Sequence, residues 1–321
     1  MRKPRRLILC GTTLLLYFLV LGCQPATELS DSPRVVASIP PLAMLAAEIR
    51  GDAAAVSSFL PPGGNPHQFE PRPSDVRRAA QASVVVYVGE GFDDWVSKIV
   101  NEVGENSKSV IRCADHVTLL PHLGEEVTGE EPTREEHRAD PAHEMDPHFW
   151  LDPIEAAQIG VELAEALAEQ DPVHATDYRD RARALALQLE RLDAELRDQL
   201  EPLRGTRFIA THAGWAYFAR RYGLEQVAVV ELAPGREPGP RRLAQLVELA
   251  HRKNVKAIFS ELQLADGSAR VLSSELNVPV IALDPLGGAG VVGRDSVEAL
   301  LRWNAQRLVD ALAPVESTRR E

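Results

Sequence analysis

Cysteine is scarce in this chain, which contains only three such residues among 321. The pattern Cys-x-x-Cys is absent, so neither a thiolate zinc site nor a dithiol redox centre is supported. Positive charge is also in short supply, because 35 lysines and arginines face 47 aspartates and glutamates and leave a formal net charge of −12. A chain this acidic is a poor partner for the phosphates of nucleic acids and a plausible host for cations.

The N-terminus carries a targeting pattern rather than part of a fold. Arg2, Lys3, Arg5 and Arg6 precede an almost entirely apolar run over residues 7–21. This run is shorter than the roughly 20 residues of a membrane-spanning helix, so we predict a signal peptide over residues 1–22.

The apolar run ends at Val20-Leu21-Gly22-Cys23, which resembles the lipobox of bacterial lipoproteins, in which the cysteine becomes the lipidated first residue. An ordinary cleaved signal peptide and an uncleaved anchor are the alternatives. We expect residues 23–33 to tether an extracytoplasmic protein, periplasmic or at the cell surface, to the membrane through a lipid on Cys23. Only Cys113 would then remain as a free thiol, so the fold must depend on burial rather than on a disulfide.

Short β-branched runs alternate with helical patterns through the rest of the chain. This alternation predicts parallel strands joined by helical crossovers, and therefore an α/β fold. The expected strands of a first lobe and then of a second lobe cover residues 34–38, 56–60, 84–88, 109–112, 207–210, 227–230, 256–260 and 279–283.

A long helical pattern lies between the two sets of strands. Asp171 and Pro172 are typical of a helix start, and Pro202 is typical of a helix end. We therefore predict a rigid linking helix over residues 171–202, between an N-terminal lobe at 34–170 and a C-terminal lobe at 203–315. A single stiff connection of this kind would limit hinge motion between the lobes.

Residues 121–147 are acidic, irregular and interspersed with histidine. A segment this long without periodicity is either functional or a surface loop. One hypothesis is a low-affinity loop that gathers cations beside a main site, and the preferred one is a solvated, mobile surface segment.

Four potential metal ligands lie where strands or turns run into loops. His67 lies in a turn stiffened by proline and loosened by glycine, Pro61-Pro62-Gly63-Gly64-Asn65-Pro66, and His148 precedes a helix start at Asp152-Pro153. His212 follows an expected strand, as does Asp284. Three imidazoles and one carboxylate suit zinc, and two ligands from each half suit a metal held in the cleft between the lobes.

Two further features complete this predicted site. Glu261 follows the strand at 256–260, and we expect it to lie outside the ligand set and to accept an imidazole N–H. The segment after His212 carries Trp215, Tyr217 and Phe218 and is expected to be a helix that His212 opens. A helix N-terminus disfavours an imidazolium and would keep this ring neutral for metal binding.

The motifs that carry these residues resemble those of the zinc/manganese substrate-binding lipoproteins of bacterial ABC importers, the cluster A metal-binding proteins. Along nearly the whole mature chain, in order, the matching segments are SIPPL at 38–42, PGGNPHQFEP at 62–71, VGEGFDDW at 88–95, PHFWLDP at 147–153, residues 211–224 and LDPLG at 283–287.

This resemblance implies two α/β lobes joined by a long helix, with a divalent metal between them that is handed to a permease and its ATPase. It places the metal ligands on His67, His148, His212 and Asp284. Histidine at the third position favours zinc, with manganese as the alternative. It implies a monomer that is a transport component and not an enzyme. A zinc hydrolase, with Glu261 as its general base, and an adhesin with a structural metal are the less favoured alternatives.

Overall fold

The computed structural model describes residues 33–104, 108–122, 145–231 and 237–313. The predicted signal peptide, Cys23 with nearly all of its tether, and the middle of the acidic segment lie outside these residues. From Pro33 onward the chain forms one compact unit. Within the described ranges, no helix is both long enough and apolar enough to cross a membrane.

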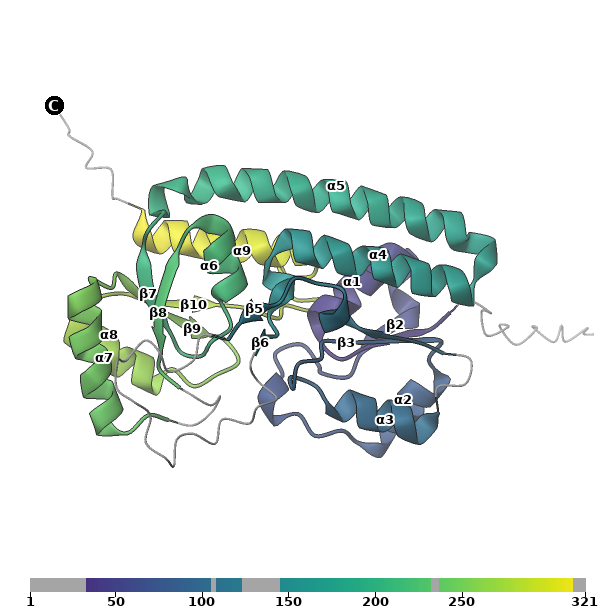
Figure 1. The fold of residues 1–321 in the computed structure, drawn as a ribbon, viewed down its shortest axis with the longest axis horizontal. Helices are drawn as coiled ribbons and strands as arrows, with labels where there is room; N and C mark the ends of the chain where they lie inside the picture. Colours follow the sequence, from purple (N-terminus) through teal and green to yellow (C-terminus); the bar gives the residue numbers. More distant parts are fainter. Residues whose placement is uncertain (1–32, 105–107, 123–144, 232–236, 314–321) are drawn as a thin grey trace, which may run out of the picture. The chain divides into compact units, whose positions relative to one another are not determined.

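The first lobe contains a four-stranded parallel sheet in the order β2-β1-β3-β4 (Figure 1). Its strands are β1 (Val35–Ala37), β2 (Val56–Ser58), β3 (Val84–Tyr87) and β4 (Ser109–Arg112), and its helices are α1 (Pro40–Arg50), α2 (Pro73–Gln81) and α3 (Trp95–Val103). Alternate side chains pack on opposite faces: Val35 and Ala37 join the core beneath α1, whereas Val36 and Val85 pack with residues of α2 and α3.

The second lobe contains another four-stranded parallel sheet, in the order β10-β9-β7-β8. Its strands are β7 (Arg207–Ala210), β8 (Glu225–Val229), β9 (Ala257–Glu261) and β10 (Val280–Leu283), and its helices are α6 (Ala216–Tyr222), α7 (Pro240–Lys253), α8 (Gly267–Leu276) and α9 (Val297–Leu312). The two-lobed α/β fold with parallel sheets is confirmed, and all eight expected strands are present to within two residues at each end.

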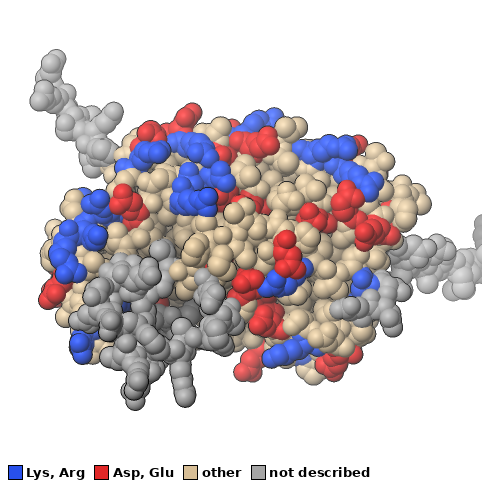
Figure 2. Space-filling view, in the orientation of Figure 1, with Lys and Arg blue, Asp and Glu red and all other residues tan. Residues whose placement is uncertain are grey.

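One long helix, α5 (Ala175–Leu200), connects the lobes, and a second long helix packs beside it. Helix α4 (Pro153–Gln170) packs along α5, and α9 of the second lobe packs on α5, α4 and α1 (Figure 1). The linking helix expected over 171–202 is therefore present, with one difference at each end. Residues Pro172–His174 and Glu201–Leu203 form 3-10 turns. Pro202 lacks the N–H that a continuous α-helix would use, whereas Pro172 lies at a first helical position, where no such N–H is needed. Acidic and basic side chains alternate along the edge formed by α5 (Figure 2).

One apolar core runs through both lobes. It joins Val84 of the first sheet, Leu189 and Leu192 on the inner side of α5, and Phe208 and Leu283 of the second sheet. Since the two sheets share this core, motion of one lobe against the other would disturb close packing. The lobe boundaries at residues 34–170, 171–202 and 203–315 stay a prediction.

The ends of the acidic segment are more regular than expected. Strand β5 (Leu120–Pro121) pairs in antiparallel fashion with β6 (Met145–Asp146), where the sequence suggested irregular structure. This pairing fixes Asp146 at the base of the segment, two residues before His148. Within the described residues, the other short helical turns are Ala53–Ala55, Pro66–Gln68, Cys113–Asp115 and Phe149–Leu151.

Candidate metal centre

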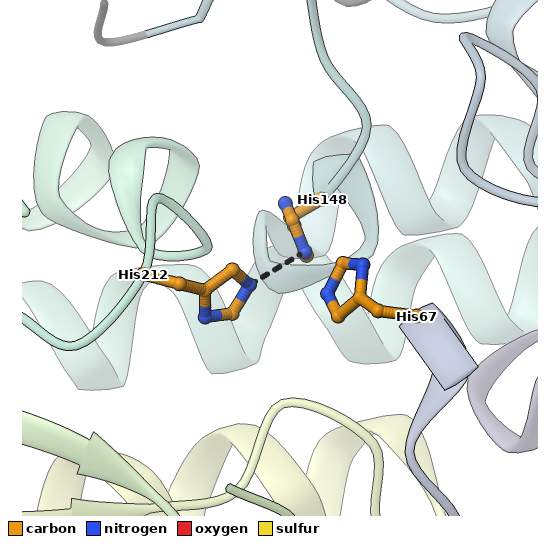
Figure 3. A group of neighbouring side chains, drawn as sticks. All are labelled: His67, His148 and His212. Carbon is orange, nitrogen blue, oxygen red and sulfur yellow. Dashed lines mark hydrogen bonds between the residues drawn. The ribbon is translucent and has the colours of Figure 1, made fainter. Parts of the chain in front are cut away.

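Three of the predicted ligands come together. His67, His148 and His212 each present a ring nitrogen, and these atoms all lie within 4.8 Å of one another (Figure 3). His67 comes from the turn after β2, His148 from the segment after β6 and His212 from the end of β7. His148 and His212 are buried, whereas His67 is exposed and forms the solvent side of the cluster.

A short 3-10 turn, Pro66–Gln68, positions His67. The Asn65 side chain caps this turn by accepting a hydrogen bond from the His67 backbone N–H at 2.9 Å. The ring of Pro66 fixes φ at the first residue of the turn, and Gly63 adopts a positive φ of 75° that a side chain would disfavour. The ring of His67 then packs edge-on against Phe92, at a centroid distance of 5.5 Å. The turn therefore presents this imidazole with little backbone freedom left to lose.

Asp146 positions His148. Its Oδ1 accepts hydrogen bonds from both the backbone N–H and the ring Nδ1 of His148, each at 2.8 Å. A carboxylate only accepts, so Nδ1 must carry the proton and Nε2 keeps a free lone pair for a metal. Asp146 is fully buried. Asp146 falls within the acidic segment at 121–147, although the spacing Asp-x-His was a usable signal for this pair.

Glu261 lies in a similar position beside His212. Its Oε1 lies 2.8 Å from the ring Nδ1 of His212 and also accepts a hydrogen bond from the indole of Trp215 at 3.0 Å. The contact with Nδ1 is short, but its direction does not meet hydrogen-bond geometry, so it acts mainly through charge. Glu261 thus lies where the sequence placed it, outside the histidine cluster. The contacts with His212 and Trp215 also occupy the carboxylate of Glu261, which a zinc hydrolase would need as its general base.

The ionisation of His212 differs from the sequence-based expectation. Helix α6 begins only at Ala216, after a turn in which Trp215 is the capping residue, so His212 does not open the helix. Burial lowers the pKa of His212, but the charge and contact of Glu261, aided by Asp146 and Glu231, outweigh burial and raise the pKa above its ordinary value. The neighbouring carboxylate, not the helix end, controls the charge of this ring.

Apolar groups surround the three rings. Phe92 and Trp150 pack against His148 at centroid distances of 5.6 and 5.2 Å, and Leu264 and Leu286 line the same small pocket. The Trp150 indole donates a buried hydrogen bond of 2.7 Å to the Pro285 carbonyl, which ties the two lobes together beside the site. Such walls exclude water and strengthen electrostatic interactions inside the pocket.

Asp284 does not belong to this cluster. Its Oδ2 pairs with Nη1 of Arg294 at 2.6 Å, and its Oδ1 accepts hydrogen bonds from the Gln263 side chain at 2.7 Å and from the backbone of Leu286 and Gly287 at 2.9 and 3.0 Å. The carboxylate is buried. Ligation by Asp284 stays a prediction, and it would require the carboxylate to exchange the guanidinium of Arg294 for the metal.

Comparison with known proteins identifies the family of this chain. The family model for the zinc-uptake complex component A, periplasmic (ZnuA), matches residues 35–311. The chain belongs to the ZnuA family. Members of this family are metal-binding transport components and not enzymes, as expected from the sequence.

Individual relatives cover most of the chain. The zinc-binding lipoprotein AdcA of Streptococcus pneumoniae serotype 4 is 29% identical over 282 residues, which are 88% of this chain and 55% of AdcA. The chain therefore spans about half the length of AdcA. The high-affinity zinc uptake system protein ZnuA of Bacillus subtilis is 28% identical over 296 residues, 89% of this chain and 90% of that protein. A crystal structure of ZnuA matches with a TM-score of 0.71 and 30% identity, over 88% of this chain and 99% of that one.

Proposed function

We propose that this chain is an extracytoplasmic substrate-binding protein that captures a divalent metal ion, zinc, and delivers it to the permease and ATPase of an ABC importer. The metal is the transported substrate. His67, His148 and His212 are its three nitrogen donors, and Asp146 and Glu261 orient two of those rings from outside the ligand set. Membership of a family of zinc-uptake components supports this proposal.

One distance carries the assignment of the metal. Nε2 of His148 lies 3.4 Å from Nε2 of His212. Zinc binds imidazole nitrogen at about 2.0–2.1 Å with tetrahedral angles, which places two ligand nitrogens about 3.3–3.4 Å apart. The two rings therefore already have the spacing of one edge of a zinc tetrahedron.

Manganese is the alternative substrate. Mn²⁺ prefers oxygen donors and a higher coordination number, whereas this cluster offers three imidazoles and encloses them with aromatic rings. The donor set thus favours zinc. Affinity alone does not separate the two ions, because zinc binds more tightly than manganese at most nitrogen and oxygen sites.

The partners and location follow from the same proposal. A lipid on Cys23 would hold a monomer at the outer side of the membrane, where it could meet the permease. The names of the zinc-uptake relatives support a metal-importing complex and an extracytoplasmic location.

A titration of the metal-free protein tests the function. Mass spectrometry of the purified chain and competition titrations with zinc and manganese should show one tight zinc per chain and weaker manganese. His212→Ala should lose the tight site. His251→Ala, an exposed histidine on α7, is the matched control and should bind zinc like the wild type. Preferred retention of manganese would overturn the choice of metal, and the absence of stoichiometric metal would overturn the function.

A further inference from the structure

The pocket that holds the three histidines contains an oxygen donor that the sequence analysis did not consider. Gln263 follows β9 and lines this pocket together with His67, His148 and His212. Its side-chain oxygen, Oε1, is buried and has no hydrogen-bond partner among the described residues. An unpartnered buried amide oxygen costs free energy, so its presence beside a metal-binding cluster calls for a ligand.

The orientation of this amide is fixed by Asp284. The Nε2 group of Gln263 donates a hydrogen bond of 2.7 Å to Oδ1 of Asp284. Because a carboxylate only accepts hydrogen bonds, the NH₂ end of the amide must face Asp284 and the oxygen must face away from it. Rotation of the amide by 180° would bring two oxygens together and is disfavoured.

Asp284 itself is held in place by several independent contacts. Arg294 pairs with its Oδ2 at 2.6 Å, and the guanidinium also lies 4.7 Å from the ring centre of Trp303. The backbone around Arg294 is fixed as well, because its carbonyl accepts a hydrogen bond of 2.9 Å from Gly288. Movement of Asp284 toward a metal would break this ion pair and leave a largely buried guanidinium without its carboxylate.

Asp284 already has a partner for its charge. Its carboxylate pairs with Arg294, whereas Asp146 and Glu261 face the imidazoles of His148 and His212. A neutral amide oxygen can approach the metal without adding a further buried charge.

We propose that Oε1 of Gln263 is the fourth donor to the metal, and that Asp284 and Arg294 orient this amide rather than supply a ligand. This inference rests on the proposed function of the histidine cluster. It gives the bound ion three imidazoles and one neutral oxygen, a set that four-coordinate zinc accepts. A neutral oxygen also binds a cation less strongly than a carboxylate does, which suits a carrier that must release its substrate.

Two substitutions separate Gln263 from Asp284. Gln263→Leu removes the donor, and we expect zinc affinity to fall about tenfold, the effect of losing one neutral polar contact. Asp284→Asn leaves an amide oxygen that can still accept a hydrogen bond from Gln263, so we expect zinc affinity to fall less in this variant than in Gln263→Leu. Gln226→Leu, the same change at a partly buried glutamine of β8 that does not line this pocket, is the matched control.

Cobalt provides a readout that a purely structural role would not change. In cobalt-loaded Gln263→Leu, water should take the fourth position, and deprotonation of this bound water near neutral pH should make the visible spectrum depend on pH. The wild type, with the amide in that position, should show no such dependence when excess cobalt keeps the site filled at every pH. As the folding control, each metal-free variant should unfold on heating at the same temperature as the metal-free wild type.

The outcomes are distinct. Loss of affinity in Asp284→Asn with wild-type binding by Gln263→Leu would show that the carboxylate is the ligand and overturn this inference. A pH-independent cobalt spectrum in Gln263→Leu would also overturn it. If His212→Ala still binds zinc as the wild type does, the proposed function fails before the fourth donor becomes relevant.

Discussion

The imidazoles of His148 and His212 face each other through Nε2 at 3.4 Å, although they lie 64 positions apart in the sequence. Each ring has its Nδ1 2.8 Å from a buried carboxylate oxygen, of Asp146 and of Glu261 respectively. When each ring carries its proton on Nδ1, this arrangement turns two lone pairs toward one point, where they repel each other unless a cation lies between them. Either a metal ion or a proton can supply that charge, so the two compete for the same place.

Zinc binding should therefore weaken as pH falls, and it should begin to weaken at a higher pH than an ordinary histidine would cause. Glu261 and its neighbours raise the pKa of His212 above its ordinary value of 6.5, so protons compete with the metal above that pH. Zinc competition titrations from pH 5.5 to 8.5 measure this. In Glu261→Gln the decline should move to lower pH, because the charge that raises the pKa is gone. A decline confined to pH below 6 in the wild type would contradict the argument.

Asp146→Asn should weaken zinc binding by about 10- to 100-fold, the usual effect of removing a carboxylate that orients a metal-binding histidine. The amide oxygen of this variant can still accept a hydrogen bond from Nδ1 of His148, but the side chain no longer carries a negative charge. Glu165→Gln, at an exposed carboxylate of α4, should leave affinity unchanged. Equal affinities for both variants and the wild type would show that Asp146 has no part in the site.

Gly214→Ala should disturb the site without unfolding the protein. A Cβ at this position would lie 2.9 Å from Cε1 of the His212 ring and 3.2 Å from Oε1 of Glu261, so the ring and its carboxylate must shift. We expect zinc affinity to fall on the order of tenfold. Gly267→Ala is the control, because no atom lies within 4 Å of its added Cβ. Wild-type affinity in Gly214→Ala would mean that the ring position is not critical.

Asp93 should make the stability of the metal-free protein depend on pH. Burial raises the pKa of Asp93 to about 6 in the folded protein, from an ordinary value of 3.8. Between about pH 4 and pH 6, Asp93 is therefore protonated in the folded state and ionised in the unfolded state. The stability contributed by this group is fully present below about pH 4 and is lost as pH rises through 6.

A shift of this size corresponds to a few kcal/mol at most, roughly 1.4 kcal/mol per pH unit. Asp93→Asn has no such proton, so its free energy of unfolding relative to the wild type should rise between pH 4 and pH 7. Denaturant unfolding at several pH values measures this difference. The two proteins compared at each pH share all other titrating groups, including His212. A difference that stays constant with pH would contradict the assignment.

The shared core predicts that the two lobes unfold together. Leu192 of α5 is fully buried in the core that spans both sheets, so Leu192→Ala should cost about 2–5 kcal/mol and preserve a single unfolding transition. Leu187→Ala on the same helix removes an exposed side chain and should have little effect. Two separate transitions in calorimetry would show that the lobes are independent.

The fold was predictable because its signals are local. The β-branched strand runs and the prolines at 172 and 202 report burial and chain direction directly, and the resulting strands and linking helix follow them closely. His67, His148 and His212 were recognisable for the same reason, since each lies at a constrained turn or strand end.

The finer features of the site depend on contacts between distant residues. The link between Asp284 and Arg294 requires a particular path of the loop from 285 to 294, which no periodicity encodes. In the sequence, Asp146 is one more charge in an acidic segment. Only the pairing of β5 with β6 shows that it lies beside His148. The start of α6 depends on Trp215, whose indole bonds to Glu261 from another strand.

A crystal structure of the zinc-loaded protein, with anomalous diffraction recorded at the zinc edge, tests the central claim most directly. We predict one zinc ion bound by a ring nitrogen of His67 and by Nε2 of both His148 and His212, at about 2.0–2.1 Å. An anomalous peak elsewhere, or a metal that touches fewer than two of these imidazoles, would contradict the account.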